Sequence, residues 1–196
     1  MEILEKLLGG GARIRVMRLF LLNPEQVFER KEIAKRSMVK RPSLRRELSV
    51  LEKTRFLKKK GKGYVMNTEF KYYIPMRDLL IGTEFLRKEE LEKRFKPAGR
   101  VSLLLAAGIF INDPKSRLDL LIVGDRLKKG ILEKIVKSIE ADIGKELSYA
   151  VFDNADYVYR LSMYDKLVRD VLDFPHEVII DKKLSTSAFK NKTKVV

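Results

Sequence analysis

Apolar positions in the first part of the chain recur at helical spacing. From Ala12 to Leu22 apolar side chains are interspersed with three arginines, and Asn23-Pro24 closes the run. A residue before proline disfavours the helical conformation, so we predict that this helix ends there. The next segment with this spacing predicts a second, short helix over Phe28–Ser37, with Ile33 and Ala34 turned inward.

A third helix and a hairpin are predicted next. The helix begins at Pro42, because proline at the first helical position loses no hydrogen bond, and it runs to about Thr54. Its leucines at 44, 48 and 51 form one buried stripe. Residues 56–60 and 64–67 then predict two short strands around the turn signal Gly61-Lys62-Gly63.

The remainder of the chain alternates between strand-like and helix-like patterns. Residues 67–82 predict a connecting helix that could bend at Pro75, and Thr83–Phe95 predicts another helix. Continuous apolar runs bounded by turn residues predict buried strands. The expected strands are Val101–Phe110, Leu118–Val123, Leu147–Phe152 and His176–Asp181, with helices over Leu127–Ile143 and Ala155–Phe174. The chain is therefore expected to be α+β, with a mixed sheet in its second half.

Positive charge is concentrated at the two ends of the chain. The 196 residues carry a net charge of +15. Residues 1–66 hold 18 Lys and Arg against 7 acids, residues 67–181 are close to neutral, and residues 182–196 hold 5 Lys and no acid. Concentrated positive charge favours a polyanionic partner, because each neutralised phosphate releases counterions. The alternative is a solubilising surface, but solubility alone does not require one module to carry the excess charge.

The order helix, helix–turn–helix and basic hairpin is typical of a winged helix-turn-helix. If the third helix buries its leucines, its basic face points outward, and a helix of this kind fits the major groove of DNA. Arg45 and Arg46 are the expected base readers, and the hairpin lysines would reach phosphate or the minor groove. The residues expected to contact DNA are Lys40, Arg41, Ser43, Arg45, Arg46, Ser49, Lys53, Lys58, Lys60 and Lys62.

Composition excludes several kinds of chemistry. No Cys is present, which removes disulfides, iron–sulfur clusters and a thiol nucleophile, and the single His176 cannot build a multi-histidine metal site. No run of apolar residues is long enough to span a bilayer, and the N-terminus is a poor signal peptide. We therefore expect a cytoplasmic protein with no cofactor and no membrane partner.

The segment from Gly108 to Ser116-Arg117-Leu118-Asp119-Leu120-Leu121-Ile122-Val123-Gly124-Asp125 resembles the nucleotidyltransferase fold of the DNA polymerase β superfamily. That family places a Gly-Ser pair after its first strand and two acids at i and i+2 on the next strand. A third acid comes from a later strand. Carboxylates at i and i+2 point to one face of a strand, where they can share two Mg²⁺ ions.

This chain departs from that pattern at most of the chemical positions. Gly108 is present, but Ile109 stands where the serine belongs, and Arg117 occupies the place of the first acid. Asp119 matches the second acid. An arginine brings a fixed positive charge where Mg²⁺ would bind, so it could pair with Asp119 or a neighbouring acid instead. We expect Gly108, Arg117 and Asp119 to be a vestigial site in a catalytically inactive domain.

Taken over residues 4–181, the chain resembles prokaryotic winged-helix transcriptional regulators that carry a degenerate nucleotidyltransferase-like domain at the C-terminus. The resemblance rests on LEKLLGGGARIRVMRLFLLNPEQVF, RRELSVLEKTRFLKKK, SRLDLLIVGD and YRLSMYDKLVRDVLDFPHEVII. The expected domains are 1–66 (winged helix), 67–98 (helical linker), 99–183 (nucleotidyltransferase-like) and 184–196 (disordered basic tail).

The expected function is a sequence-specific, double-stranded DNA-binding regulator, most simply a homodimer, because two half-sites multiply specificity. The second domain would then serve dimerisation, ligand sensing or partner binding, with a protein or a nucleotide as its ligand. Two alternatives stay open. One is an active nucleotidyltransferase that modifies protein or RNA through Asp119, and the other is an antitoxin-like adaptor whose α/β domain binds a partner protein.

Overall fold

The computed structural model describes residues 2–81 and 88–182, which form two compact units. The first unit holds the described part of Met1–Phe85 together with Val136–Glu146, and the second holds Leu86–Ile135 and the described part of Leu147–Val196. The fold is mixed α and β, as predicted. Among the helices that are described, none is long and apolar enough to cross a membrane.

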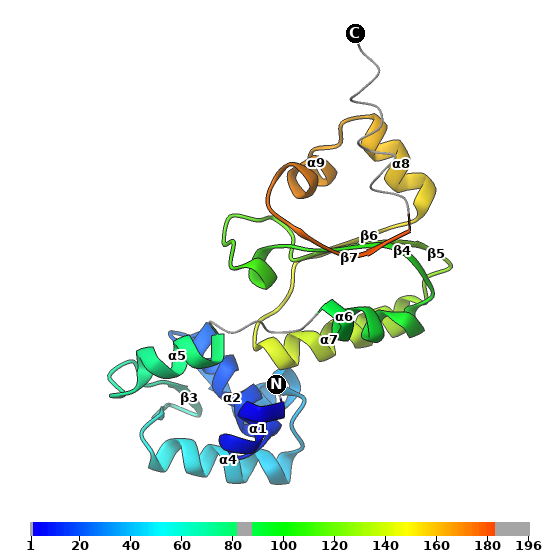
Figure 1. The fold of residues 1–196 in the computed structure, drawn as a ribbon. Helices are drawn as coiled ribbons and strands as arrows, with labels where there is room; N and C mark the ends of the chain where they lie inside the picture. Colours follow the sequence, from blue (N-terminus) through cyan, green and yellow to red (C-terminus); the bar gives the residue numbers. More distant parts are fainter. Residues whose placement is uncertain (1, 82–87, 183–196) are drawn as a thin grey trace. The chain divides into compact units, whose positions relative to one another are not determined.

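The first unit is built from helices around a small antiparallel sheet (Figure 1). Its strands lie in the order β1-β3-β2. The elements are α1 (Glu2–Leu7), α2 (Gly11–Leu22), β1 (Phe28–Glu29), α3 (Arg30–Ser37), α4 (Arg41–Lys53), β2 (Leu57–Lys60), β3 (Gly63–Met66) and α5 (Tyr73–Ile81).

The core of the first unit is the one that the leucine stripe predicted. Leu44, Leu48 and Leu51 of α4 are buried in one cluster with the apolar face of α2. Phe20 and Phe28 meet edge to face in the same cluster, with ring centroids 5.5 Å apart. Leu80 of α5 is also part of it, so the segment predicted as a connecting helix packs into this core.

Residues 136–146 complete the first unit, although they follow it by more than fifty positions in sequence. They include the C-terminal turns of α7 (Lys129–Ile143). Arg18 of α2 is only 1% exposed; its Nε donates to the Leu80 carbonyl at 2.9 Å and its Nη1 to the Asp142 carbonyl at 3.0 Å. Burial lowers the pKa of this guanidinium, and the nearby Asp142 carboxylate opposes that shift. One buried arginine thus ties three segments together.

The second unit is a four-stranded mixed sheet with helices on both faces (Figure 1). Its order is β6-β5-β4-β7, with β5 and β6 parallel and the other pairs antiparallel. Helices α8 and α9 cover one face, and α6 lies on the other. The elements are α6 (Lys88–Phe95), β4 (Arg100–Ala106), β5 (Leu120–Asp125), β6 (Tyr149–Phe152), α8 (Asn154–Ser162), α9 (Lys166–Asp173) and β7 (Glu177–Asp181), with 3₁₀ turns η1 (Lys96–Ala98) and η2 (Gly108–Ile111).

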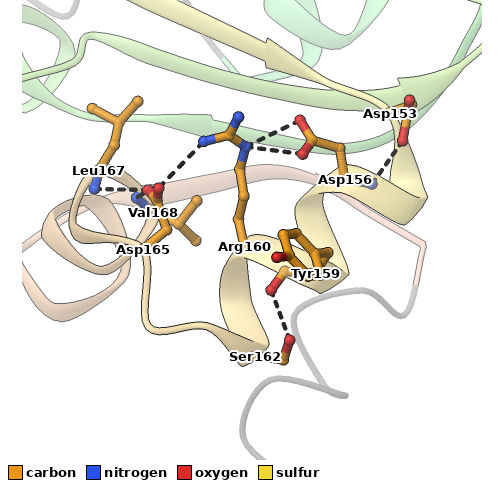
Figure 2. A network of polar contacts seen from close by, with 8 residues as sticks. All are labelled: Asp153, Asp156, Tyr159, Arg160, Ser162, Asp165, Leu167 and Val168. Atoms are coloured by element: carbon orange, nitrogen blue, oxygen red, sulfur yellow. Dashed lines mark hydrogen bonds and ion pairs between the residues drawn. The ribbon is translucent and has the colours of Figure 1, made fainter.

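The helix predicted over Ala155–Phe174 is two helices, α8 and α9. Tyr164, between them, takes a left-handed conformation (φ 57°). Asp165 then caps α9 by accepting from the backbone N–H groups of Leu167 (2.9 Å) and Val168 (3.2 Å), as Figure 2 shows. Arg160 bridges the break through ion pairs with Asp156 and Asp165. Aspartate is a favoured N-cap residue, so Asp165 indicates the start of a second helix. The apolar spacing continues on both sides of Asp165 and therefore does not reveal the break.

Other features differ from those expected. Phe28–Glu29 pairs with β3 as strand β1, so the second helix begins only at Arg30. The strand predicted over Val101–Phe110 ends at Ala106, where Gly108 (φ +53°) opens η2. Pro75 lies in the first turn of α5, where a missing N–H costs nothing, so it need not bend the helix. Residues 83–87 of the helix predicted over Thr83–Phe95, and the basic tail from 184, lie outside the described residues.

Candidate nucleic-acid interface

Helix α4 has two faces of opposite character. Leu44, Leu48 and Leu51 recur at i, i+4 and i+7 and are no more than 3% exposed. Pro42 stands in the first helical turn, where its ring restrains φ without costing a hydrogen bond. The face opposite the leucines is therefore held outward by the burial of three large apolar side chains.

The outward face carries cations that no carboxylate neutralises. Arg45, Arg46, Ser49 and Lys53 are all exposed, at positions that share this face of the helix. Within residues 2–81 and 88–182, none of the three cations has an ion-pair partner. Arg41 and Lys40, at the N-terminal end of the helix, are likewise exposed and free of ion pairs there.

The two acids of α4 are engaged on its flanks. Glu47 accepts from Arg13 of α2, with Oε2 2.6 Å from Nε, and Glu52 pairs with Lys59 of β2 at 2.9 Å. The hydrogen bond that Lys59 donates to Glu52, together with the negative charge of Glu52, raises the pKa of Lys59. Neither acid therefore offsets the outward charge of Arg45, Arg46 and Lys53.

The hairpin β2–β3 divides its lysines into two groups. Lys60 and Lys62, at the tip beside Gly61 (φ +57°), are exposed and without ion pairs in the described chain. Lys58 instead pairs with Glu69 at 2.6 Å, which lowers the pKa of that carboxyl. Ser43, also predicted as a contact, is half-buried on the flank of α4 away from Arg45. The predicted residues thus lie at two places, along α4 and at the hairpin tip, and Lys58 is the one already held in an ion pair.

Two hollows adjoin these cations. We call the first the α4 hollow: it has a volume of about 260 Å³ and is lined by Arg30, Lys31, Arg41, Leu44, Arg45 and Leu48. The second, the hairpin hollow, has about 230 Å³ and is lined by Glu29, Arg30, Lys31, Lys59, Gly61, Lys62, Gly63 and Tyr64. Both share Arg30 and Lys31, which open α3.

Arg30 and Lys31 were missed from the sequence because the second helix was expected to begin at Phe28. In that reading both residues lie inside a helix, with no reason to single them out. The short strand β1 moves the helix start to Arg30 and brings both cations to the hollows. The alternation of buried Phe28 with exposed Glu29 was the available signal, but two residues are too few to establish it.

In the second unit, Asp119 is held by backbone donors. Its Oδ1 accepts from Ile109 N–H at 2.9 Å, and its Oδ2 accepts from Ser148 N–H at 2.8 Å. Gly108 makes this possible, since a Cβ at that position would lie 2.2 Å from Oδ1 of Asp119. Gly108 and Asp119, predicted as parts of one vestigial site, are therefore in direct contact and join β5, η2 and the start of β6.

Arg117 does not join that pair. Its Nε lies 3.0 Å from Oδ2 of Asp170 on α9. Of the two partners expected from the sequence, Asp119 or a neighbouring acid, Arg117 therefore pairs with a neighbouring acid. A hollow of about 300 Å³ lies beside this ion pair, and acidic as well as basic side chains line it. Its lining residues are Asp113, Lys115, Ser116, Arg117, Asp170 and Phe174. No group of three or more His, Asp or Glu side chains capable of holding a metal ion occurs in the part of the chain that the structure describes.

Comparison of the chain with models of protein families, with curated proteins and with solved structures gave no match.

Proposed function

We propose that the protein is a sequence-specific, double-stranded DNA-binding transcriptional regulator, and that its first unit is a winged helix-turn-helix domain. The succession α2, β1, α3, α4, β2 and β3 supports this, because a helix–turn–helix followed by a basic hairpin matches that arrangement. On this proposal α4 lies in the major groove and the β2–β3 hairpin reaches the adjoining backbone.

The observation that carries the proposal is the outward face of α4. Arg45, Arg46 and Lys53 are exposed and unneutralised on the side opposite a fully buried leucine stripe. Unneutralised cations on one rigid helix favour a polyanion, because binding releases its condensed counterions. Two adjacent arginines add base readout, since the guanidinium forms bidentate hydrogen bonds with the O6 and N7 atoms of guanine.

The second unit enters the proposal as a non-catalytic domain of the nucleotidyltransferase type, used for dimerisation, ligand sensing or partner binding. Both carboxylate oxygens of Asp119 already accept backbone hydrogen bonds, and Arg117 places a cation at the position of the missing acid. The regulator is proposed to act as a homodimer in the cytoplasm, because paired half-sites raise specificity.

Selection from a random double-stranded DNA pool at physiological salt tests the proposal, with Arg45→Ala/Arg46→Ala selected in parallel. We expect an enriched motif for the wild-type protein and none for the double variant. The symmetry of the motif and its half-site spacing would report the oligomer. Salt-sensitive binding without enrichment, in both proteins, would contradict a sequence-specific regulator.

Incubation with labelled nucleoside triphosphates and Mg²⁺ or Mn²⁺ tests the role of the second unit. The proposal expects no transfer of label to protein or RNA. Transfer that is lost in Asp119→Ala, with the fold of the variant intact, would instead establish an active nucleotidyltransferase.

A further inference from the structure

Six cations surround the two adjoining hollows of the first unit, and three of them stand outside the set predicted to contact DNA. The α4 hollow and the hairpin hollow share Arg30 and Lys31. Arg41 and Arg45 line the former, and Lys59 and Lys62 line the latter. A continuous cationic surface therefore joins the N-terminal turns of α4 to the tip of the hairpin.

Arg30 is held in place by a buried tyrosine. Its Nη2 donates to the hydroxyl of Tyr64 at 3.0 Å, and its guanidinium carbon lies 5.8 Å from the centroid of the same ring. Tyr64 is only 3% exposed, so the ring that holds the guanidinium is itself fixed by the core. A cation held in this way loses less side-chain entropy when it binds an anion than a freely rotating lysine does.

The hydroxyl of Tyr64 retains a proton to donate. It accepts from Arg30, and a phenol is both a donor and an acceptor. Because Tyr64 lines the hairpin hollow, an anion there could receive the phenolic O–H as well as Arg30 N–H. The two donors would then act on one oxygen-rich ligand.

The balance of charge favours an anion in both hollows. No carboxylate lines the α4 hollow. Glu29 lines the hairpin hollow, and Lys59 there is engaged by Glu52, which leaves Arg30, Lys31 and Lys62 as its free cations. Arg30 and Lys31 line both hollows, so each of them contributes positive charge to both.

We propose that the two hollows seat neighbouring phosphates of one strand of bound duplex, with Arg30, positioned by Tyr64, contacting the phosphate at their junction. The inference rests on the proposed function and adds to it a backbone contact at the start of α3. A phosphodiester fits because its anionic oxygens accept charge-assisted hydrogen bonds from guanidinium and phenol donors.

Fluorescence anisotropy with a labelled duplex of arbitrary sequence, titrated over a range of salt, tests this seat. Arg30→Ala should weaken binding about tenfold, the value of one hydrogen bond to a charged group. It should also reduce the slope of log K against log salt by about one, because one phosphate contact is lost. The matched control is Lys35→Ala, an exposed cation of the same helix that lines neither hollow, and it should change affinity less than twofold.

Tyr64→Phe separates positioning from charge. It keeps the number of cations, so the salt slope should stay as in the wild type while affinity falls a few-fold. In the Arg30→Ala background Tyr64→Phe should cost less than it does alone, because only the direct O–H donation to the phosphate is then lost and the positioning of Arg30 is already absent. If Arg30→Ala unfolds the unit, as thermal melts would show, Arg30→Gln takes its place in the same titrations.

The results of these titrations distinguish a failure of the phosphate contact at Arg30 from a failure of the proposed function. Wild-type binding to duplex, with Arg30→Ala indistinguishable from Lys35→Ala, overturns the phosphate seat and leaves the proposed function standing. Additive effects of Arg30→Ala and Tyr64→Phe overturn the positioning role of Tyr64. Absence of any duplex binding by the wild type overturns the proposed function itself.

Discussion

The outward face of α4 and the Asp119 site use charge in opposite ways. On α4, Arg45, Arg46 and Lys53 project from a rigid helix with no carboxylate partner among the described residues. In the second unit, both carboxylate oxygens of Asp119 accept hydrogen bonds from backbone N–H groups. Charge left free at a surface is available to a ligand, whereas charge satisfied by the backbone stabilises a loop. On the proposed function, binding is therefore assigned to the first unit, whereas the hydrogen bonds of Asp119 support the structure of the second unit.

The largest effect should follow from removing Asp119. Asp119→Ala leaves the N–H groups of Ile109 and Ser148 without their acceptors, and each charge-assisted hydrogen bond contributes about 1.5–3 kcal/mol. We expect the second unit to lose about 2–3 kcal/mol in urea unfolding, because water can replace the acceptor of the exposed Ser148 N–H but less readily that of Ile109. Duplex affinity should be unchanged where the unit remains folded.

Asp119→Asn is the matched control, because it removes the charge of Asp119 and keeps the shape of the side chain. Its amide presents one oxygen and one NH₂ group to the two N–H donors, so it should recover about half of the loss. Unchanged stability in both variants would show that the carboxylate is not structural, and would return Asp119 to the candidates for chemistry.

Arg46→Ala should act on binding and leave stability unchanged. The side chain is exposed and makes no ion pair within the described chain. Loss of a bidentate base contact should cost about 1–3 kcal/mol of specific binding and relax preference at one base position. Competition binding with single-base operator variants measures both effects, and equal losses on every duplex would reassign Arg46 to the phosphate backbone.

Substitution of the hairpin lysines should have a smaller effect on affinity, and the effect should differ between Lys60 and Lys58. Lys60→Ala should weaken all duplexes alike and reduce the salt slope by about one. Lys58→Ala should have less effect, because Lys58 is already paired with Glu69 at 2.6 Å. Salt titrations of both variants in parallel check the ranking, and a larger loss for Lys58 would show that its ion pair opens on binding.

Tyr157 offers the mildest test, and it concerns the second unit. Its hydroxyl is buried with no hydrogen-bond partner in the described structure, and burial, helped by Asp181, raises its pKa to about 12. The unfolded phenol ionises near its ordinary value of 10, so stability present below pH 10 is lost as the pH rises from 10 towards 12. Tyr157→Phe should raise stability slightly at neutral pH, because it removes a buried hydroxyl that has no partner, and it should abolish that alkaline loss in denaturant titrations.

The sequence predicts the secondary structure of the first unit well because its signals are local. The leucine spacing of α4, Pro42 in its first turn and the Gly61-Lys62-Gly63 turn each act within a few residues. By contrast, the cations at the start of α3 were missed because β1 forms only by pairing with β3, which lies more than thirty positions later. Pairing at such separation leaves no periodicity within β1 itself.

Local sequence patterns also do not predict that residues 136–146 belong to the first unit. Gly144 (φ +93°) packs so closely on α2 that a Cβ would lie 2.5 Å from the backbone nitrogen of Leu19. Nothing near Gly144 in the sequence indicates this contact. Likewise, Arg18 falls in a run of cations that the helical pattern alone would place at the surface, yet it is buried by α5 and α7.

Of the three residues predicted to form a vestigial site, Gly108 and Asp119 lie in contact, whereas Arg117 pairs elsewhere. The strand pattern around Asp119 was visible in the sequence. The ion pair of Arg117 with Asp170 was not, because it depends on where α9 begins, and α9 begins at the Asp165 cap.

The most direct test of the central claim is the ratio of affinities for the selected motif and for a scrambled duplex of equal length, at one salt concentration. The proposed function predicts a ratio of at least about 10³ for the wild-type protein, typical of specific DNA recognition. For Arg45→Ala/Arg46→Ala it predicts a ratio near one, with residual salt-dependent binding through the phosphate seat. A wild-type ratio near one, or an undiminished ratio in the double variant, would contradict base reading by the outward face of α4.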